Sequence, residues 1–193
     1  MKNAYFKTLT GLFSAIEATE KDGLFLEFSR AHRAAVRLLE NTRSKNKVFL
    51  VGNGGSASIA SHIAVDFLKN GRISAYALND PSFLTCMSND YGYEYVFSKP
   101  LETLIRKGDV LLAISSSGAS ANILGAAASA RKKGANVITF SGFMPDNPLR
   151  TCGAINFYVP SSSYGYVEIV HLAVCHEIAD ALTGKMQLES KKR

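Results

Sequence analysis

The chain has 193 residues, of which 47% are hydrophobic and 20% charged, and its formal net charge is +6. This length suits a single domain with a sizeable core, and the composition is that of an ordinary globular protein. No stretch approaches the ~20 apolar residues of a membrane-spanning helix. The three cysteines (Cys86, Cys152 and Cys175) are scattered, which excludes a disulfide framework and a CxxC metal site.

The N-terminus and the basic residues indicate where the protein is located in the cell and what it binds. The first 12 residues contain neither a long apolar stretch nor a small-residue cleavage signal, so we expect no export signal and a cytoplasmic protein. The positive charge suits a small anionic ligand. Because no aromatic–basic interleaving or recognition-helix motif accompanies it, we expect neither a nucleic-acid nor a membrane partner.

Residues 1–45 predict helices, because apolar residues recur at helical spacing from Phe6 to Leu39. Asp22–Gly23 predicts a break between two helices. An apolar helical pair ahead of the first strand needs a partner surface, so we expect this segment to serve oligomerisation.

Strands and helices alternate over residues 46–184, the expected core of a single domain spanning 1–193, and residues 185–193 are expected to form a flexible tail. The predicted strands are Lys47–Val51, Ile73–Leu78, Asp109–Ile114, Asn136–Phe140 and Ala154–Val159. The predicted helices are Ser56–Lys69, Pro81–Asp90, Tyr95–Arg106, Ala119–Lys133 and Tyr166–Leu182. Strands that are apolar throughout predict an α/β fold with a covered parallel sheet, which binds ligands at the carboxyl ends of its strands.

Two loops after predicted strands can hold an anion. Gly52–Ser56 (GNGGS) leads from the first strand into a helix, where glycines permit close approach and backbone N–H groups attract negative charge. A glycine-rich turn without a ligand explains this loop equally well. After the third strand, Ser115–Ser120 (SSSGAS) places several hydroxyls before another helix, more than a single helix cap requires.

Other phosphate motifs are absent. The chain contains no GxxxxGK[ST], which disfavours a nucleotide triphosphatase, and GNGGS does not fit the dinucleotide-binding GxGxxG.

Histidines and carboxylates concentrate on two predicted helices. His62 and Asp66 are four residues apart and share one helical face, so they can chelate a metal, act as an acid–base pair, or form a simple surface pair. Glu168, His171 and His176 lie on the otherwise apolar last helix, where buried polar groups need partners.

Three segments (Val51–Ser56, Ser88–Tyr93 and Gly108–Asn122) resemble the sugar isomerase (SIS) family. Within it the chain is similar to the enzymes that convert sedoheptulose 7-phosphate to glycero-manno-heptose 7-phosphate for lipopolysaccharide or capsule. The similarity extends from Lys47 to Leu182. It implies a three-layer αβα fold with a five-stranded parallel sheet, a homotetramer with active sites at subunit interfaces, and bound zinc.

The resemblance also implies roles for individual residues. Those expected to bind the phosphorylated sugar are Asn53, Gly54, Ser56, Asp90, Ser115, Ser116, Ser117, Ser120 and Glu168. Those expected to ligate zinc are His62, Asp66, Glu168 and His176. Asp66 is the expected catalytic base and His176 the expected acid.

The chain departs from the family pattern at several of these positions. Asp66 replaces the usual Glu, and Glu168 replaces the usual Gln. An acidic and a basic residue are usual where this chain has Gly165 and Tyr166, so the sugar-contacting edge differs.

Two other functions fit the same fold. A non-catalytic sugar-phosphate sensor or adaptor would not need His62, Asp66 and His176 together, which favours the enzyme; an isomerase of another ketose phosphate is the second possibility. A sugar-phosphate aminotransferase is disfavoured, because we expect a single sheet domain and find no N-terminal cysteine nucleophile.

Overall fold

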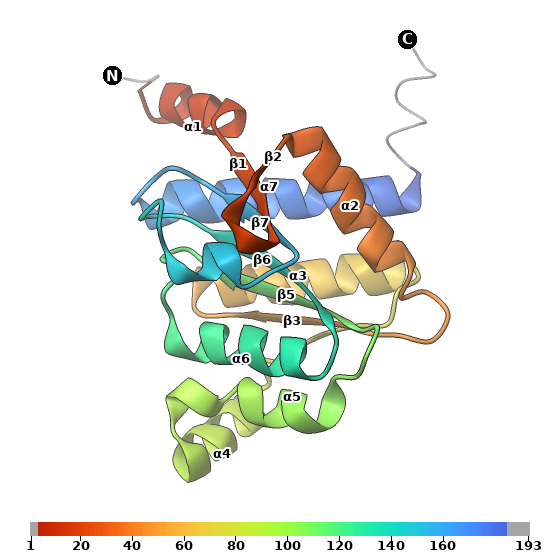
Figure 1. Cartoon of the computed structure of the whole chain (residues 1–193). Helices are drawn as coiled ribbons and strands as arrows, with labels where there is room; N and C mark the ends of the chain where they lie inside the picture. The colour runs from red at the N-terminus through yellow and green to blue at the C-terminus, as the bar shows by residue number, and fades with distance from the viewer. Residues whose placement is uncertain (1–3, 185–193) are drawn as a thin grey trace.

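A computed structural model describes residues 4–184, which form one sheet with helices on both faces (Figure 1). The strands are β1 (Glu17–Glu20), β2 (Phe25–Leu26), β3 (Val48–Gly52), β4 (Ala75–Ala77), β5 (Val110–Ser115), β6 (Asn136–Ser141) and β7 (Ile155–Tyr158). The helices are α1 (Ala4–Ser14), α2 (Phe28–Glu40), α3 (Gly55–Lys69), α4 (Pro81–Tyr91), α5 (Ser98–Leu104), α6 (Ala121–Lys132) and α7 (Tyr164–Thr183), with short 3₁₀ helices η1 (Lys21–Gly23), η2 (Tyr93–Tyr95) and η3 (Pro148–Thr151). The expected flexible tail, 185–193, lies outside the described residues.

The sheet has seven strands in the order β2-β1-β7-β6-β5-β3-β4. The five strands from β7 to β4 are parallel, and their positions agree with the five predicted strands. The prediction that these five make up the whole sheet is wrong, because β1 and β2 extend it with antiparallel pairing. The hairpin supplies hydrogen-bond partners to the edge of β7, which would otherwise be left open.

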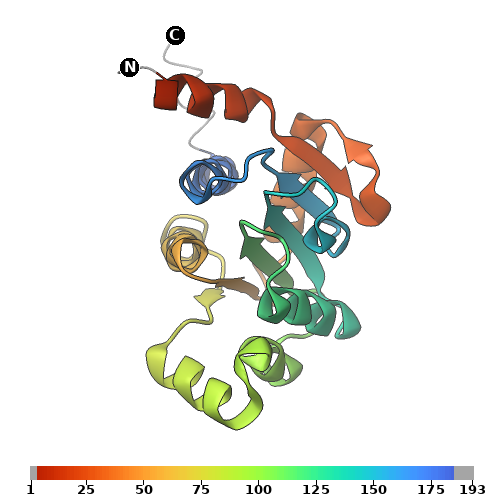
Figure 2. The same cartoon turned by 90° about the vertical axis from the view of Figure 1, so that its left-hand side faces the viewer.

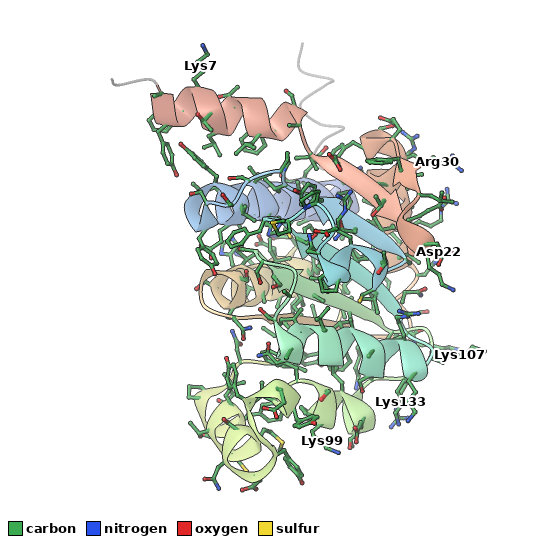
Figure 3. All side chains as sticks on the ribbon, turned by 60° about the vertical axis from the view of Figure 1, so that its left-hand side comes forward. Lys7, Asp22, Arg30, Lys99, Lys107 and Lys133 are labelled. Carbon is green, nitrogen blue, oxygen red and sulfur yellow. The ribbon has the colours of Figure 1, made fainter. Side chains whose placement is uncertain are left out.

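The prediction of two helices separated only by a break at Asp22–Gly23 is therefore wrong between Glu17 and Leu26. Helices α1 and α2 form, but the segment between them is a hairpin that turns at Asp22 and Gly23, each with φ +78°. Asp and Gly tolerate this left-handed conformation, so the dipeptide that suggested a helix break makes a strand turn instead. Figure 3 shows Asp22 at the outer end of this hairpin.

Two helical layers cover the sheet (Figure 2). Helices α1, α2, α3 and α7 lie over one face, and α5 and α6 lie over the other, with α4 beyond them. Strand residues alternate between the two layers: Leu50 and Leu112 pack toward α3 and α7, and Phe49 and Leu111 pack toward α5 and α6. Among residues 4–184, every helix falls short of the length or hydropathy that a membrane span requires.

The sheet register brings the two polar loops together. Gly52, the last residue of β3, is paired with Ile114 near the end of β5. Because parallel strands end at the same edge of a sheet, the loops that follow β3 and β5 are neighbours.

Helix α7 is held against the sheet by a buried histidine. The Nε2 atom of His171 lies 3.0 Å from the carbonyl oxygen of Ser141 at the end of β6, and the ring packs edge-on against Phe140. Burial lowers the pKa of His171 to about 4, because the charged imidazolium would lose its hydration. The neutral ring donates to Ser141 and fixes the register of α7 on β6.

We predict that His171 makes the protein acid-labile. Its pKa rises from about 4 in the folded chain to about 6.5 on unfolding, so the stability present above pH 6.5 is lost as the pH falls toward 4. The His171→Gln variant keeps an N–H donor but does not titrate. Urea unfolding at about pH 7 and about pH 4.5 should show a pH-dependent loss smaller by roughly 2–3 kcal/mol in this variant than in the wild type. Equal losses in both proteins would contradict the assignment.

Candidate active site

The loop after β3 turns sharply into α3. A side chain on Gly52 would overlap the backbone of Ser56, so only glycine permits this turn. Gly54 is the N-cap residue of α3, with φ +53°, and it is exposed to solvent. Backbone N–H groups of the first helical turn therefore face the sheet edge where the two polar loops meet.

The loop after β5 is a compact cluster of hydroxyl groups. The Oγ atom of Ser115 lies 3.2 Å from Ser120 Oγ and 3.5 Å from Ser117 Oγ, and it accepts a hydrogen bond from the Gly118 backbone N–H. Gly118 has φ +64°, and any side chain there would overlap Asn147. The loop thus holds three hydroxyls together directly before the N-terminus of α6.

The two loops and the start of α7 enclose a small cavity of about 110 Å³. Its lining consists of Asn53, Ser56, Ile114, Ser115, Ser116, Ser117, Ser120, Tyr164 and Glu168. Seven of the nine substrate-binding residues predicted from the sequence are among them. Tyr164, at the start of α7, was not predicted, because an exposed tyrosine at a helix end carries no recognisable motif.

The buried hydroxyl of Ser116 is evidence that this cavity binds a ligand. Its side chain is 4% exposed, and its Oγ atom has no hydrogen-bond partner in the described part of the chain. A buried hydroxyl without a partner costs about 1–3 kcal/mol. A phosphate bound in the cavity would supply the missing acceptor.

The cavity could bind an anion without a positively charged side chain. None of its lining residues is lysine or arginine, and its only ionisable groups are the Tyr164 phenol and the Glu168 carboxyl. The N-termini of α3 and α6 provide the positive potential, each equivalent to roughly half an elementary charge.

Asp90 does not lie with the other predicted sugar-binding residues. It is on the exposed last turn of α4, where Oδ1 accepts a hydrogen bond from Asn89 Nδ2 at 2.9 Å, and it does not line the cavity. Its expected contact with the sugar stays a prediction.

The residues expected to act as acid and base, Asp66 and His176, meet on helices α3 and α7. The Oδ2 atom of Asp66 lies 3.5 Å from His62 Nε2 and 3.5 Å from His176 Nδ1. The two imidazole rings are 5.0 Å apart. Asn70, which was not predicted, donates from Nδ2 to the other carboxylate oxygen of Asp66 at 3.2 Å. Two helices far apart in the sequence therefore place one carboxylate between two histidines.

These three side chains fit a metal ion. One ligand atom from each of His62, Asp66 and His176 lies within 4.8 Å of the others. A tetrahedral zinc ion with bonds of about 2.0–2.1 Å separates neighbouring ligand atoms by roughly 3.4 Å. The two contacts between Asp66 and the histidines, 3.5 Å each, are close to this value. Two imidazole nitrogens and a carboxylate oxygen are also donors that zinc accepts.

Glu168 is the fourth residue expected to ligate zinc, but within one chain the structure does not bring it to the other three. It is eight residues before His176, about 12 Å along α7, and its carboxylate lies against Gly55, where any side chain would overlap it. It lines both the serine cavity and a neighbouring open hollow of about 400 Å³ that also contains His62. Glu168 therefore lies between the phosphate-sized cavity and the histidines.

Comparisons with known proteins agree with this architecture. Residues 4–142 match the family model described as SIS domain. The chain is 36% identical over 162 residues to the phosphoheptose isomerase of Salmonella paratyphi B, covering 80% of this chain and 83% of that protein. Among solved structures, phosphoheptose isomerase GmhA from Neisseria gonorrhoeae superposes with a TM-score of 0.72 at 33% identity, covering 79% of this chain and 85% of that one. A phosphoheptose isomerase from Francisella tularensis gives 0.79 at 26% identity, covering 93% and 95%.

Zinc titration tests whether His62, Asp66 and His176 bind a metal ion. We expect His62→Ala, Asp66→Ala and His176→Ala each to weaken zinc binding at least tenfold, since losing even an outer-shell partner costs about 10–100-fold. The control is His32→Ala, because His32 belongs neither to the cluster nor to α7, and it should leave zinc affinity unchanged. Glu168→Gln should also leave zinc affinity unchanged. The affinity is measured on the full metal-free chain by competition with a chelator. The ligand set is different if His176→Ala binds zinc as tightly as the wild type. It is also different if Glu168→Gln binds zinc as weakly as His62→Ala does.

Proposed function

This chain belongs to the SIS-domain family, and we propose that it is a sugar-phosphate isomerase that converts sedoheptulose 7-phosphate to D-glycero-D-manno-heptose 7-phosphate. The curated relative and the two superposed structures carry the name of this activity. We also propose that the protein is cytoplasmic and makes heptose for lipopolysaccharide or capsule.

The observation that carries the proposal is the position of Asp66 between His62 and His176, on the same two helices that border the serine cavity. His62 is about 10 Å along α3 from Gly55, and Glu168 lies between the two ends of the site. In a heptulose 7-phosphate the carbonyl and the phosphate are at opposite ends of the molecule. A site with separate anion-binding and acid–base ends suits such a substrate.

The serine cavity would bind the phosphate. Ser115, Ser117 and Ser120 offer hydroxyl donors, and Ser116 offers a buried hydroxyl with no other partner among the described residues. Because this end of the sugar does not react, its binding energy can be used to orient the reacting carbons.

Asp66 and His176 would transfer the protons. Asp66 removes a proton from carbon 1 of the ketose, which gives an enediol, and a proton is returned to carbon 2. His176 moves a proton from the oxygen on carbon 1 to the oxygen on carbon 2. The product has the same atoms as the substrate, so no oxidant or reductant is needed.

The two oxygens of Asp66 allow it to be both a metal ligand and a base. Oδ2 faces both imidazoles, whereas Oδ1 faces Asn70. A zinc ion held by His62, Asp66 and His176 would polarise the carbonyl oxygen. Oδ1, on the other side of the carboxylate, remains able to accept a proton, and the Asn70 amide fixes its orientation.

We also propose that the protein is a homotetramer whose subunits meet over the outer face of α3, α7 and α1. Large apolar side chains are exposed there: Val65 is 59% exposed and Leu68 57% on α3, and Phe6 is 65% exposed on α1. Burying them would stabilise association by roughly 25 cal/mol per Å² of apolar surface. A neighbouring subunit at this face would also enclose the histidine cluster.

Turnover of sedoheptulose 7-phosphate tests the proposed function. We expect wild-type protein to form the heptose phosphate, and His176→Ala or Asp66→Asn to lower kcat by about 10²–10⁴-fold, since that is what general acid–base groups contribute. Calorimetry should show inorganic phosphate binding unchanged in both variants, and His32→Ala should retain full activity.

The absence of turnover by wild-type protein, with and without added zinc, would contradict the activity. Turnover of a different ketose phosphate alone would keep the isomerase and change its substrate. Equal losses of turnover and phosphate binding in His176→Ala would contradict its role as the acid.

Sedimentation velocity tests the subunit interface. We expect wild-type protein to sediment as a tetramer, and Val65→Glu or Leu68→Glu to sediment as smaller species, because a buried carboxylate is costly. Leu24→Glu is the matched control: Leu24 is 62% exposed but lies on the β1–β2 hairpin. If Val65→Glu and Leu68→Glu form tetramers as stable as those of the wild type, the interface does not include this face.

A further inference from the structure

The candidate active site does not use the positive charge of the chain. The formal net charge is +6, yet none of the lysines and arginines that the structure describes lines the serine cavity or the hollow beside the histidines. Two other hollows lie at the amino ends of β6 and β7, the opposite edge of the sheet from the serine loop, and cations line both. Arg30, Lys107 and Lys133, labelled in Figure 3, lie along one side of the molecule.

The first of these hollows, about 570 Å³, lies between the turn of the β1–β2 hairpin and the end of α6. Its three charged side chains are all cationic: Lys21 from the hairpin, and Arg131 and Lys132 from α6. The hairpin pairs with β7 and extends the sheet, which brings Lys21 to this position. Three cations from two distant segments therefore surround one hollow.

The second hollow, about 400 Å³, lies between α2 and the start of β7. Arg30, Arg33 and Arg37 line it from successive turns of α2, and Glu20 is the one carboxylate among its lining residues. Ala154 lines both hollows, so they adjoin each other. Their six cations form what we call the basic edge: Lys21, Arg30, Arg33, Arg37, Arg131 and Lys132.

Helix stability does not explain the arginines of α2. Arg30 is in the first turn, where the helix dipole disfavours a cation. Arg33 and Arg37 are four residues apart, and like charges at this spacing destabilise a helix. Within residues 4–184, no cation of the basic edge forms an ion pair with a carboxylate. The end of α6 favours cations, so Arg131 and Lys132 alone would need no ligand, but the arginines of α2 indicate one.

We propose that the basic edge binds a small molecule that carries two or more phosphate groups. Arginine can donate two parallel hydrogen bonds to one phosphate, and lysine attracts it as a compact charge. Two adjoining hollows with three cations each can hold separate phosphate groups, which a sugar monophosphate does not have. Both volumes are typical of small-molecule sites. The site is separate from the serine cavity and does not depend on the proposed isomerisation.

Calorimetric titration of the full chain with inorganic triphosphate tests the basic edge. At about 0.15 M salt, charges more than about 8 Å apart are largely screened, so general attraction contributes little. We expect Lys21→Gln/Lys132→Gln and Arg33→Gln/Arg37→Gln each to weaken triphosphate binding by about tenfold or more, because each double variant loses two charge-assisted contacts. Inorganic phosphate should bind the wild type more weakly than triphosphate does.

The matched control is Lys7→Gln/Lys69→Gln. It removes the same charge from two exposed lysines outside both hollows, so it should bind triphosphate like the wild type. Wild-type affinity in either basic-edge variant, or an equal loss in the control, would overturn the proposal. So would phosphate binding as tight as triphosphate binding. A single-stranded oligonucleotide that binds more tightly than triphosphate, and is weakened in both basic-edge variants, would replace the small molecule by a nucleic acid.

Discussion

The packing of α3 against α7 is the interaction on which the candidate site depends. Both helices lie on the same face of the sheet and bury an apolar seam that includes Ile63 and Val174. This contact places Asp66 of one helix 3.5 Å from His176 of the other. The aspartate has one methylene fewer than the glutamate usual in the family, yet it contacts both imidazoles, so the shorter side chain does not disrupt the cluster.

The same helices connect the acid–base cluster to the anion-binding end of the site. Helix α3 begins at the sheet edge beside the serine loop, and α7 begins on the other side of that cavity. In the proposed complex, their first turns would therefore face the phosphate and their later turns the reacting carbons. Glu168 lies where the two regions meet. Its carboxylate can accept hydrogen bonds from the hydroxyls of a sugar that extends from the serine cavity toward the histidines.

Local sequence patterns predicted the parts of the structure that depend on local physics. Apolar runs located all five parallel strands, and the i,i+4 spacing of His62 and Asp66 gave one half of the cluster. The β1–β2 hairpin was missed, because four residues with two glutamates carry no strand signal until they pair with β7. The hydrogen bonds between Asn53 and Asn122 beside the serine cavity were also missed, since the two residues are 69 apart and amide pairs leave no pattern in a sequence.

The most direct test is a crystal structure of the protein with sedoheptitol 7-phosphate, the reduced sugar that cannot isomerise. Our account predicts phosphate oxygens within hydrogen-bond distance of Ser115, Ser117 and Ser120, and carbons 1 and 2 beside Asp66 and His176. A phosphate bound in the serine loop with those two carbons directed away from both residues, and from their counterparts in every neighbouring subunit, would contradict it.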